Sequence, residues 1–211
     1  MIRFAGVIYN AIDCSKYPFN TGSREDYLLF LSRLSPEKGA HIAIEVARKL
    51  NMRLIIAGVS QPQYKDYFQN VIEPLIDGKL ITYESEVSHQ RKKELLANAK
   101  CLLAPVQWPE PFGLFMVEAL ACGTPVVALN KGSTSEIVVS GKTGYVVETT
   151  EEMLKAVKMV DLLDPYECRS LAKENFDVPI FADNYLCAYE QVIEGEKTKE
   201  AMAESGLIVR E

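Results

Sequence analysis

Short runs of apolar residues recur along the chain, and segments with helical periodicity separate them. Apolar residues dominate each run, which is typical of strands that are buried on both faces. The runs are YLLFL (27–31), RLIIAG (53–58), KLITY (79–83), CLLAP (101–105), PVVAL (125–129) and GYVV (144–147). Strands of this kind, connected by helices, form a parallel sheet covered on both faces. The sequence therefore predicts an α/β fold with a doubly wound, Rossmann-like parallel sheet.

The segments between the runs carry apolar residues at helical spacing. Two sets share a helix face, namely Ile42, Val46 and Leu50 in one segment and Leu95, Leu96 and Ala99 in another. Ser88 is well placed to cap the second helix. After residue 148 only helical patterns remain, over about 150–163, 165–174 and 180–194. We predict one domain over 1–194, followed by a charged tail, 195–211, that is prone to fraying or disorder.

Composition narrows the class of protein. The 211 residues are 48% hydrophobic, which is enough to build a sizeable core. A net charge of −6 argues against a protein whose main task is binding nucleic acid or an anionic membrane. No apolar run approaches the ~18 residues that a membrane span needs, and the first ten residues lack the apolar stretch of a signal peptide.

The cysteines indicate the redox environment of the protein. There are five, an odd number, and their spacing matches no disulfide pattern: Cys14, Cys101, Cys122, Cys168 and Cys187. Three lie in apolar segments, which predicts small buried thiols rather than disulfides. A reducing, cytoplasmic location fits this composition best.

The loop SRLSPEKGA follows the first predicted strand. In an open parallel sheet, ligands bind beyond the carboxyl ends of the strands, where loops lead into helix N-termini. Ser35 and Pro36 mark a helix start, and Arg33 and Lys38 lie on either side of them. Two cations here can converge on one dianionic group, with the helix amides adding to their field. Taken alone, the loop is equally compatible with two solvated surface charges.

The segment EPFGLFMVEALACGTPVVAL places Glu110 and Glu118 in an otherwise apolar run. Burying an unpaired carboxylate is costly, so each must face water, pair within the protein or await a ligand. Gly113 permits close approach to the free amides at the helix start, and Glu118 leans back toward that start. Both carboxylates can border one pocket and accept hydrogen bonds from a vicinal diol such as a ribose or hexose edge. The alternative is a helix cap for Glu110 and a buried ion pair for Glu118.

The sequence lacks the common motifs for binding nucleotide triphosphates, dinucleotides and metal ions. SGKTG lacks the first glycine of a nucleotide-triphosphate loop, because position 136 is Glu136, and the segment leads into a strand and so predicts a tight turn. No G-x-G-x-x-G follows a strand, and there is no D-x-D. His41 and His89 lie at no metal-ligand spacing from a cysteine or carboxylate. We therefore expect neither a metal ion nor another cofactor.

In combination these segments resemble the C-terminal, donor-binding domain of retaining glycosyltransferases of the GT-B fold. The family is glycosyltransferase family 4, which includes glycogen synthases and bacterial mannosyltransferases. The resemblance runs over about 7–194, through VIYNAID, FLSRLSPEKG, RLIIAG, AKCLLAPVQWPEPFGLFMVEALACGTPVVA, GSTSEIV, GKTGYVV and NYLCAYEQVI. The E-x7-E spacing with PFGL inside it is the most specific part. Ala11 and Ser135 depart from the usual glycine and proline, outside the proposed chemistry.

The resemblance implies a role for each candidate residue. Arg33 and Lys38 would hold the donor diphosphate, and Glu110 would contact the transferred sugar, which makes these three the catalytic set. The remaining donor contacts would be the amides of Phe112, Gly113 and Leu114 at the sugar, Glu118 at the ribose, and backbone near Val87 at the base. The donor would be a UDP-, GDP- or ADP-sugar.

The resemblance also implies that a second domain is needed. Enzymes of this family resemble two facing domains with the acceptor site on the N-terminal one, and this chain begins where the second domain normally starts. We expect the isolated chain to bind donor without transferring sugar, and the N-terminal domain to be supplied in cis or in trans. The alternatives are a noncatalytic nucleotide-sugar binding module and, among enzymes, a phosphorylase or epimerase of the same fold.

Overall fold

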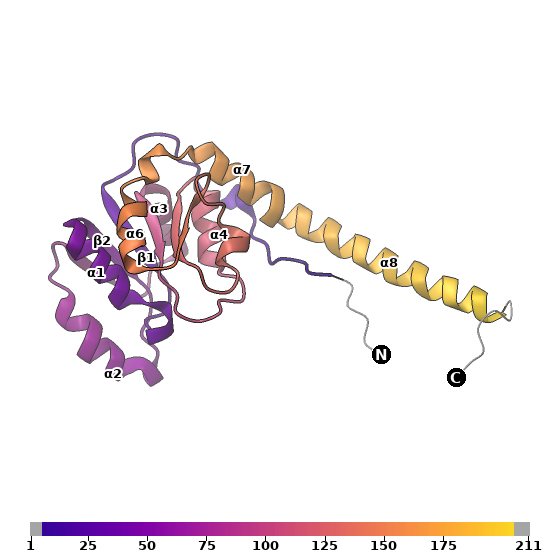
Figure 1. Ribbon diagram of the computed structural model, residues 1–211, viewed down its shortest axis with the longest axis horizontal. Helices are drawn as coiled ribbons and strands as arrows, with labels where there is room; N and C mark the ends of the chain where they lie inside the picture. The colour runs from indigo at the N-terminus through magenta and orange to yellow at the C-terminus, as the bar shows by residue number, and fades with distance from the viewer. Residues whose placement is uncertain (1–5, 205–211) are drawn as a thin grey trace.

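A computed structural model describes residues 6–204 of the chain, with side chains through residue 194. A parallel sheet lies at its centre, between helices (Figure 1). The sheet has six strands in the order β3-β2-β1-β4-β5-β6. The strands are β1 (Tyr27–Leu31), β2 (Arg53–Ala57), β3 (Ile81–Glu84), β4 (Cys101–Ala104), β5 (Val126–Leu129) and β6 (Gly144–Val147). The predicted fold class is confirmed, and each predicted strand lies within two residues of its expected limits.

Helices connect the strands and follow the last strand. They are α1 (Ala40–Leu50), α2 (Lys65–Tyr67), α3 (His89–Asn98), α4 (Leu114–Ala121), α5 (Thr134–Ile137), α6 (Thr150–Val157), α7 (Pro165–Phe176) and α8 (Val178–Glu204). Short 3₁₀ and π turns extend α2 over residues 62–75, a helical segment that the apolar pattern did not predict. The α8 helix projects away from the body of the molecule, on the side where the N-terminal segment also leaves it (Figure 1).

Alternate strand residues enter two separate cores. Leu28 and Phe30 pack on one face of the sheet with α1, α6 and the 62–75 segment. Leu29 and Leu31 pack on the other face with α3, α4 and α7. Side chains of a strand point alternately to the two faces of the sheet, and burying each leucine contributes about 1.5–3 kcal/mol. An entirely apolar strand gains this contribution on both faces only when helices cover both. This explains why the uninterrupted apolar runs form the central strands.

Several helix limits differ from the sequence-based expectation. The predicted 150–163 helix ends at Val157 and continues as a separate 3₁₀ turn over Val160–Leu162. Ala99, expected on a helix face, is the extended C-cap of α3. The predicted 180–194 helix begins at Val178 and continues to Glu204, well into the predicted tail; residues 205–211 lie outside the described part. None of the described helices is both long enough and apolar enough to cross a membrane.

The sheet order fixes where a ligand can bind. β1 lies between β2 and β4, so the connections after β1 and after β4 run to opposite sides of the sheet. The crevice at such a reversal, beyond the carboxyl ends of the strands, is the usual binding site of an open α/β sheet. The loops that carry Lys38 and Glu110 begin at this reversal.

Candidate functional site

Lys38 and Glu110 form a buried ion pair between the loops after β1 and β4. The two residues are 6% and 7% exposed, and the ammonium of Lys38 also lies 5.1 Å from the centroid of the Trp108 ring. Lys38 ends the 3₁₀ turn Pro36–Lys38, which Gly39 terminates at a φ of 77°. A Cβ at residue 39 would lie 2.1 Å from the carbonyl oxygen of Pro105, so glycine lets the two loops meet.

The Glu110 loop is fixed from a third direction. Trp108 Nε1 donates to Glu110 Oε2 at 2.9 Å, and the amide of Ser133 donates to the Glu110 carbonyl at 2.9 Å. Gly132, at a φ of 61°, approaches so closely that a Cβ would lie 2.4 Å from the Glu110 backbone. The loop after β5 therefore holds the loop after β4 in place, and Glu110 with it.

The start of α4 offers free backbone donors. Gly113, at a φ of 79°, is the N-cap, and within the described chain the amides of Phe112, Gly113 and Leu114 donate no hydrogen bond. The Ser133 hydroxyl donates to the Phe112 carbonyl at 2.8 Å. Unpaired amides at a helix start are a ready site for an anion or a hydroxyl oxygen. This is the arrangement predicted from the PFGL segment.

An aromatic cluster supports this turn from behind. The Phe112 ring lies 6.0 Å from that of Tyr9 and 5.6 Å from that of Phe176, centroid to centroid. The Tyr9 hydroxyl donates to Glu136 Oε2 at 2.7 Å. Residues near both ends of the domain thus hold the α4 start in position.

Glu118 lies one helical turn further along α4 and is 9% exposed. Its Oε1 accepts hydrogen bonds from the Tyr17 hydroxyl at 2.7 Å and from Lys92 Nζ at 2.5 Å. Burial, together with this hydrogen bond, raises the pKa of the Tyr17 phenol, which remains a donor. An ion pair, the alternative weighed for Glu118, is therefore present, with Glu118 buried and the Lys92 side chain 21% exposed.

Each of the two carboxylates accepts side-chain hydrogen bonds through only one of its oxygens. Glu110 Oε2 accepts from Lys38 and Trp108, and Glu118 Oε1 accepts from Lys92 and Tyr17. Among the described residues, nothing donates to Glu110 Oε1 or Glu118 Oε2. Each carboxylate is thus charge-compensated through one oxygen and has the other available as an acceptor.

The other predicted residues lie outside this buried set. The Arg33 side chain is 46% exposed, and its guanidinium lies 3.9 Å from the carboxylate of Glu37. Arg33 is therefore not part of the buried Lys38–Glu110 pair. Val87 lies between β3 and α3, packed against the core cluster that includes α4. Ser35 occupies the N-cap of the 3₁₀ turn without forming a side-chain cap. The alternative of two solvated surface charges is wrong for Lys38, because the ion pair with Glu110 buries it.

The two histidines, His41 and His89, lie in different surroundings. His41 Nδ1 lies 2.8 Å from the Tyr67 hydroxyl and its Nε2 lies 3.2 Å from Gln107 Nε2. Burial lowers the pKa of His41, which favours the neutral ring. His89 is exposed at the start of α3. No cluster of three potential metal ligands occurs among the residues that the structure describes.

Sequence reasoning missed the residues that hold the carboxylates. Trp108 contacts Glu110 within an irregular loop, and Tyr17 and Lys92 are far from Glu118 in the sequence. Helical or strand periodicity therefore gives no signal for these contacts. Trp108 alone had a local cue, because it is the only tryptophan and lies two residues before Glu110.

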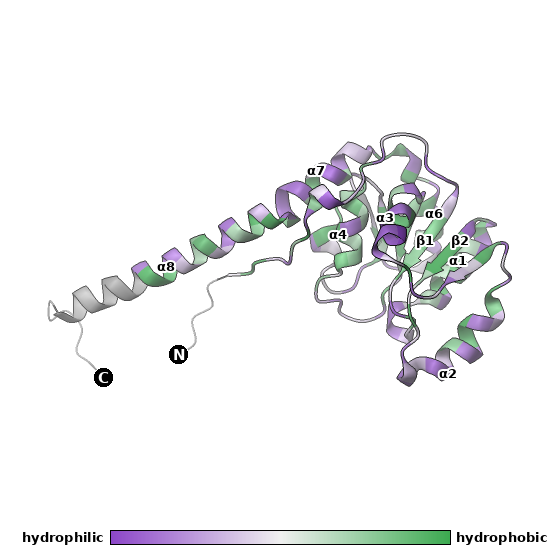
Figure 2. Cartoon of the chain, turned by 180° about the vertical axis from the view of Figure 1, so that it is seen from behind, coloured by the Kyte–Doolittle hydropathy of each residue, from purple (hydrophilic) through white to green (hydrophobic). Residues whose placement is uncertain are grey.

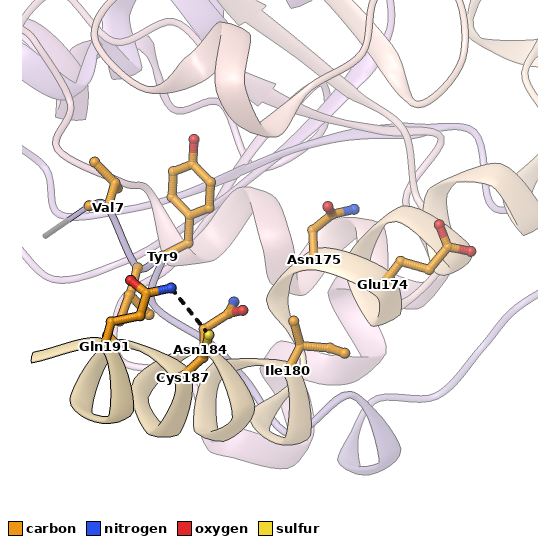
Figure 3. Close-up of a pocket in the computed structure, with 11 residues that line it drawn as sticks. Val7, Tyr9, Glu174, Asn175, Ile180, Asn184, Cys187 and Gln191 are labelled. Carbon is orange, nitrogen blue, oxygen red and sulfur yellow. Dashed lines mark hydrogen bonds between the residues drawn. The ribbon is translucent and has the colours of Figure 1, made fainter. Parts of the chain in front are cut away.

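A separate cleft of about 470 Å³ lies between the N-terminal segment and the last two helices (Figure 3). Asn175, Asn184 and Gln191 contribute amide groups to it, and Gln191 donates to the sulfur of Cys187 at 3.5 Å. None of the predicted site residues lines this cleft.

Residues 15–175 match the protein family described as Glycosyl transferases group 1. The chain belongs to this family. It is 36% identical over 151 residues to a glycogen synthase of Mycobacterium tuberculosis, a match that covers 65% of this chain and 34% of that protein. It is 28% identical over 182 residues to the putative glycosyltransferase YtcC of Bacillus subtilis, covering 74% of this chain and 44% of that protein.

Solved structures show the same fold. AviGT4, a glycosyltransferase involved in avilamycin A biosynthesis, is 30% identical with a TM-score of 0.74, over 90% of this chain and 58% of that chain. Anabaena Alr3699/HepE, solved in complex with UDP and glucose, has a TM-score of 0.72 at 23% identity, over 92% of this chain and 57% of that chain. The group 1 chain thus has the Rossmann-like fold of GT-B glycosyltransferases and spans between a third and about half the length of these curated relatives.

Proposed function

We propose that this chain is the donor-binding half of a retaining glycosyltransferase that uses a nucleotide-diphosphate sugar. The observation that carries the proposal is the buried Lys38–Glu110 pair beside the free amides of the α4 start, at the sheet reversal of a group 1 glycosyl transferase. The pair combines a cation for a diphosphate with an acceptor for sugar hydroxyls. The UDP and glucose in the HepE crystal structure support the same class of ligand.

In this proposal each group has a defined task. Lys38 and the more exposed Arg33 stabilise the negative charge that develops on the leaving diphosphate, as preorganised electrostatic groups. Glu110 Oε1 and the amides of residues 112–114 hold the transferred sugar. Glu118 Oε2 accepts from the ribose, and backbone near Val87 meets the base. Arg33 and Lys38 hold the diphosphate without a metal ion.

Transfer requires a second domain in cis or in trans, because one half-site leaves the sugar carbon open to water without a positioned nucleophile. The chain spans only part of its relatives, which supports this requirement. The projecting helix supports it too: apolar residues recur along α8 in Figure 2, and Tyr185, Leu186, Tyr189, Val192 and Ile193 expose side chains on adjoining helical positions. Five free cysteines support a reducing, cytoplasmic setting.

Calorimetric titration with UDP-, GDP- and ADP-glucose tests donor binding. We expect one of them to bind in EDTA and none to yield a glycoside when an acceptor is added to the isolated chain. Absence of binding by all three at several millimolar would overturn the proposal. Binding without transfer, even after the N-terminal half is added, would instead identify a noncatalytic module.

Retention is tested on the enzyme assembled with its other half. The anomeric proton of the product should report the same configuration as the donor. A product of inverted configuration would refute a retaining mechanism while keeping the donor-binding role.

A further inference from the structure

Lys92 and Tyr17 converge on Glu118 from two separate parts of the chain. Lys92 is on α3, and Tyr17 follows a 3₁₀ turn, Cys14–Lys16, near the start of the domain. We propose that these two side chains are positioning residues that orient Glu118 to recognise the ribose of the donor. This inference rests on the proposed function, and it goes beyond it by assigning ribose selectivity to two residues outside the family motif.

Both donors engage the same carboxylate oxygen. The Tyr17 hydroxyl and Lys92 Nζ lie 2.7 and 2.5 Å from Glu118 Oε1, and no described residue donates to Oε2. Two donors on one oxygen restrict rotation of the carboxylate, so Oε2 keeps one direction. A fixed acceptor discriminates a hydroxyl from a hydrogen better than a mobile one, because its hydrogen bond carries little additional ordering cost.

Tyr17 is itself held rigidly. It is 7% exposed, and Arg169 of α7 donates to its carbonyl at 3.2 Å and to the Cys14 carbonyl at 2.8 Å. The ammonium of Lys93 lies 5.5 Å from the centroid of its ring. The Tyr17 hydroxyl is therefore a stationary donor, against which the Glu118 side chain is set.

Lys92 adds a charge effect. A bare carboxylate near the diphosphate would repel it, and the ammonium at 2.5 Å from Glu118 compensates that charge. The same pairing occurs at Glu110 with Lys38. The site thus offers carboxylate acceptors to sugar hydroxyls without excess negative charge facing the phosphates.

The test compares ribose with deoxyribose ligands on the intact chain. UDP, GDP and ADP are titrated first, and the tightest is compared with its 2′-deoxy counterpart. We expect roughly a 10-fold preference for the ribose form in the wild type, from one hydrogen bond to a charged group. Lys92→Met and Tyr17→Phe should each reduce this preference to within about threefold, and Lys92→Arg should restore it.

Lys100→Met is the matched control. Its ammonium is also 2.5 Å from a carboxylate, Asp161, and its side chain is 18% exposed against 21% for Lys92. This variant should keep the full ribose preference. Melting temperatures of all variants separate loss of fold from loss of selectivity, and if Lys92→Met does not fold, Tyr17→Phe carries the same test.

The outcomes separate the two claims. No binding of any of the three nucleotides by the wild type overturns the proposed function and this inference with it. Binding with an unchanged ribose preference in both Lys92→Met and Tyr17→Phe overturns the inference alone and makes the two residues purely structural. Binding without any ribose preference in the wild type also overturns it.

Discussion

At the scale of single residues, each carboxylate of the site is held by one lysine and one aromatic side chain. Lys38 and Trp108 donate hydrogen bonds to Glu110, and Lys92 and Tyr17 donate to Glu118. Sequence left a choice between internal partners and a ligand for both carboxylates. In the structure, one oxygen of each carboxylate pairs with side chains of the protein, and the other oxygen can accept a hydrogen bond from a ligand. Each carboxylate can therefore serve as an oriented acceptor without being an unpaired buried charge.

Removing one member of the buried pair should cost stability. Lys38→Met leaves the Glu110 charge without its ammonium, and we expect the free energy of unfolding to fall by roughly 3–5 kcal/mol. The double variant Lys38→Met/Glu110→Gln should recover at least about 1 kcal/mol of this loss, because the two residues are coupled. Urea denaturation measures both.

An exposed pair serves as the control for that cycle. Lys49 and Glu45 are 2.7 Å apart with side chains about half exposed, at 47% and 48%. Lys49→Met should change the unfolding free energy by less than about 1 kcal/mol. A loss for Lys38→Met as small as this would show that the buried pair is not what holds Glu110.

Arg33 should behave in the opposite way from Lys38. Its side chain is 46% exposed, so Arg33→Ala should leave the melting temperature unchanged. Donor affinity should fall about 5- to 10-fold, since a charge-assisted hydrogen bond contributes about 1.5–3 kcal/mol when fully formed and less at an exposed site. Calorimetry measures the affinity, and Arg53→Ala, at the exposed opposite end of β2, should leave it unchanged. Equal affinities for Arg33→Ala and wild type would remove Arg33 from the diphosphate site.

At the scale of elements, three loops meet because glycines permit close backbone approach. Gly39 joins the loop after β1 to that after β4, and Gly132 joins the loop after β5 to Glu110. The site is therefore built from loop-to-loop contacts at one edge of the sheet, and the strands fix only where those loops begin.

Gly39→Ala should be far more destabilising than Gly78→Ala. Both glycines have positive φ, at 77° and 71°, so each alanine carries a backbone cost of roughly 1–2 kcal/mol. Only at residue 39 would the Cβ also meet a carbonyl oxygen, at 2.1 Å, whereas residue 78 has open space. We expect about 3 kcal/mol for Gly39→Ala, measured by urea denaturation. Equal losses for the two variants would show that the β1 and β4 loops separate easily.

The sequence predicted the strands well because buried parallel strands have a local signature. It predicted that Lys38 and Glu110 lie in loops beyond the carboxyl ends of parallel strands, because ligand loops of βαβ units lie at that edge of the sheet. It gave no strand order, so the adjacency of β1 and β4 was not predicted. It did not predict the pairing of the two side chains, nor the contacts of Tyr17 and Lys92 with Glu118, because these depend on how loops and helices pack across more than 25 residues. The 62–75 segment was missed because its turns are short and mixed.

At the scale of the whole molecule, two helical layers enclose the sheet and bury four of the five cysteines. Burial raises the pKa of Cys101, Cys122 and Cys168 from 9.0 to about 12, and that of Cys14 to about 11. The folded chain therefore retains protons that the unfolded chain releases above pH 9.

Stability should consequently fall as the pH rises from 9 toward 12. The contribution of the raised thiol pKa values is complete below the unfolded value of 9.0 and is lost through the folded values of about 11 to 12. Urea denaturation under reducing conditions from pH 7 to 11 measures this. Cys101→Ala should flatten the decline relative to Cys187→Ala, whose parent thiol is exposed. Identical slopes for the two variants would contradict the assignment of the decline to buried thiols.

The most direct test of the donor-site account is an NMR titration of the whole chain with UDP-, GDP- and ADP-glucose in EDTA. One of them should produce saturable shifts centred on the amides of Arg33, Gly113 and Glu118. The expected dissociation constant is on the order of 0.1–1 mM, because half of the site is open to solvent. No shift at several millimolar, or shifts confined to the cleft beside α8, would contradict it.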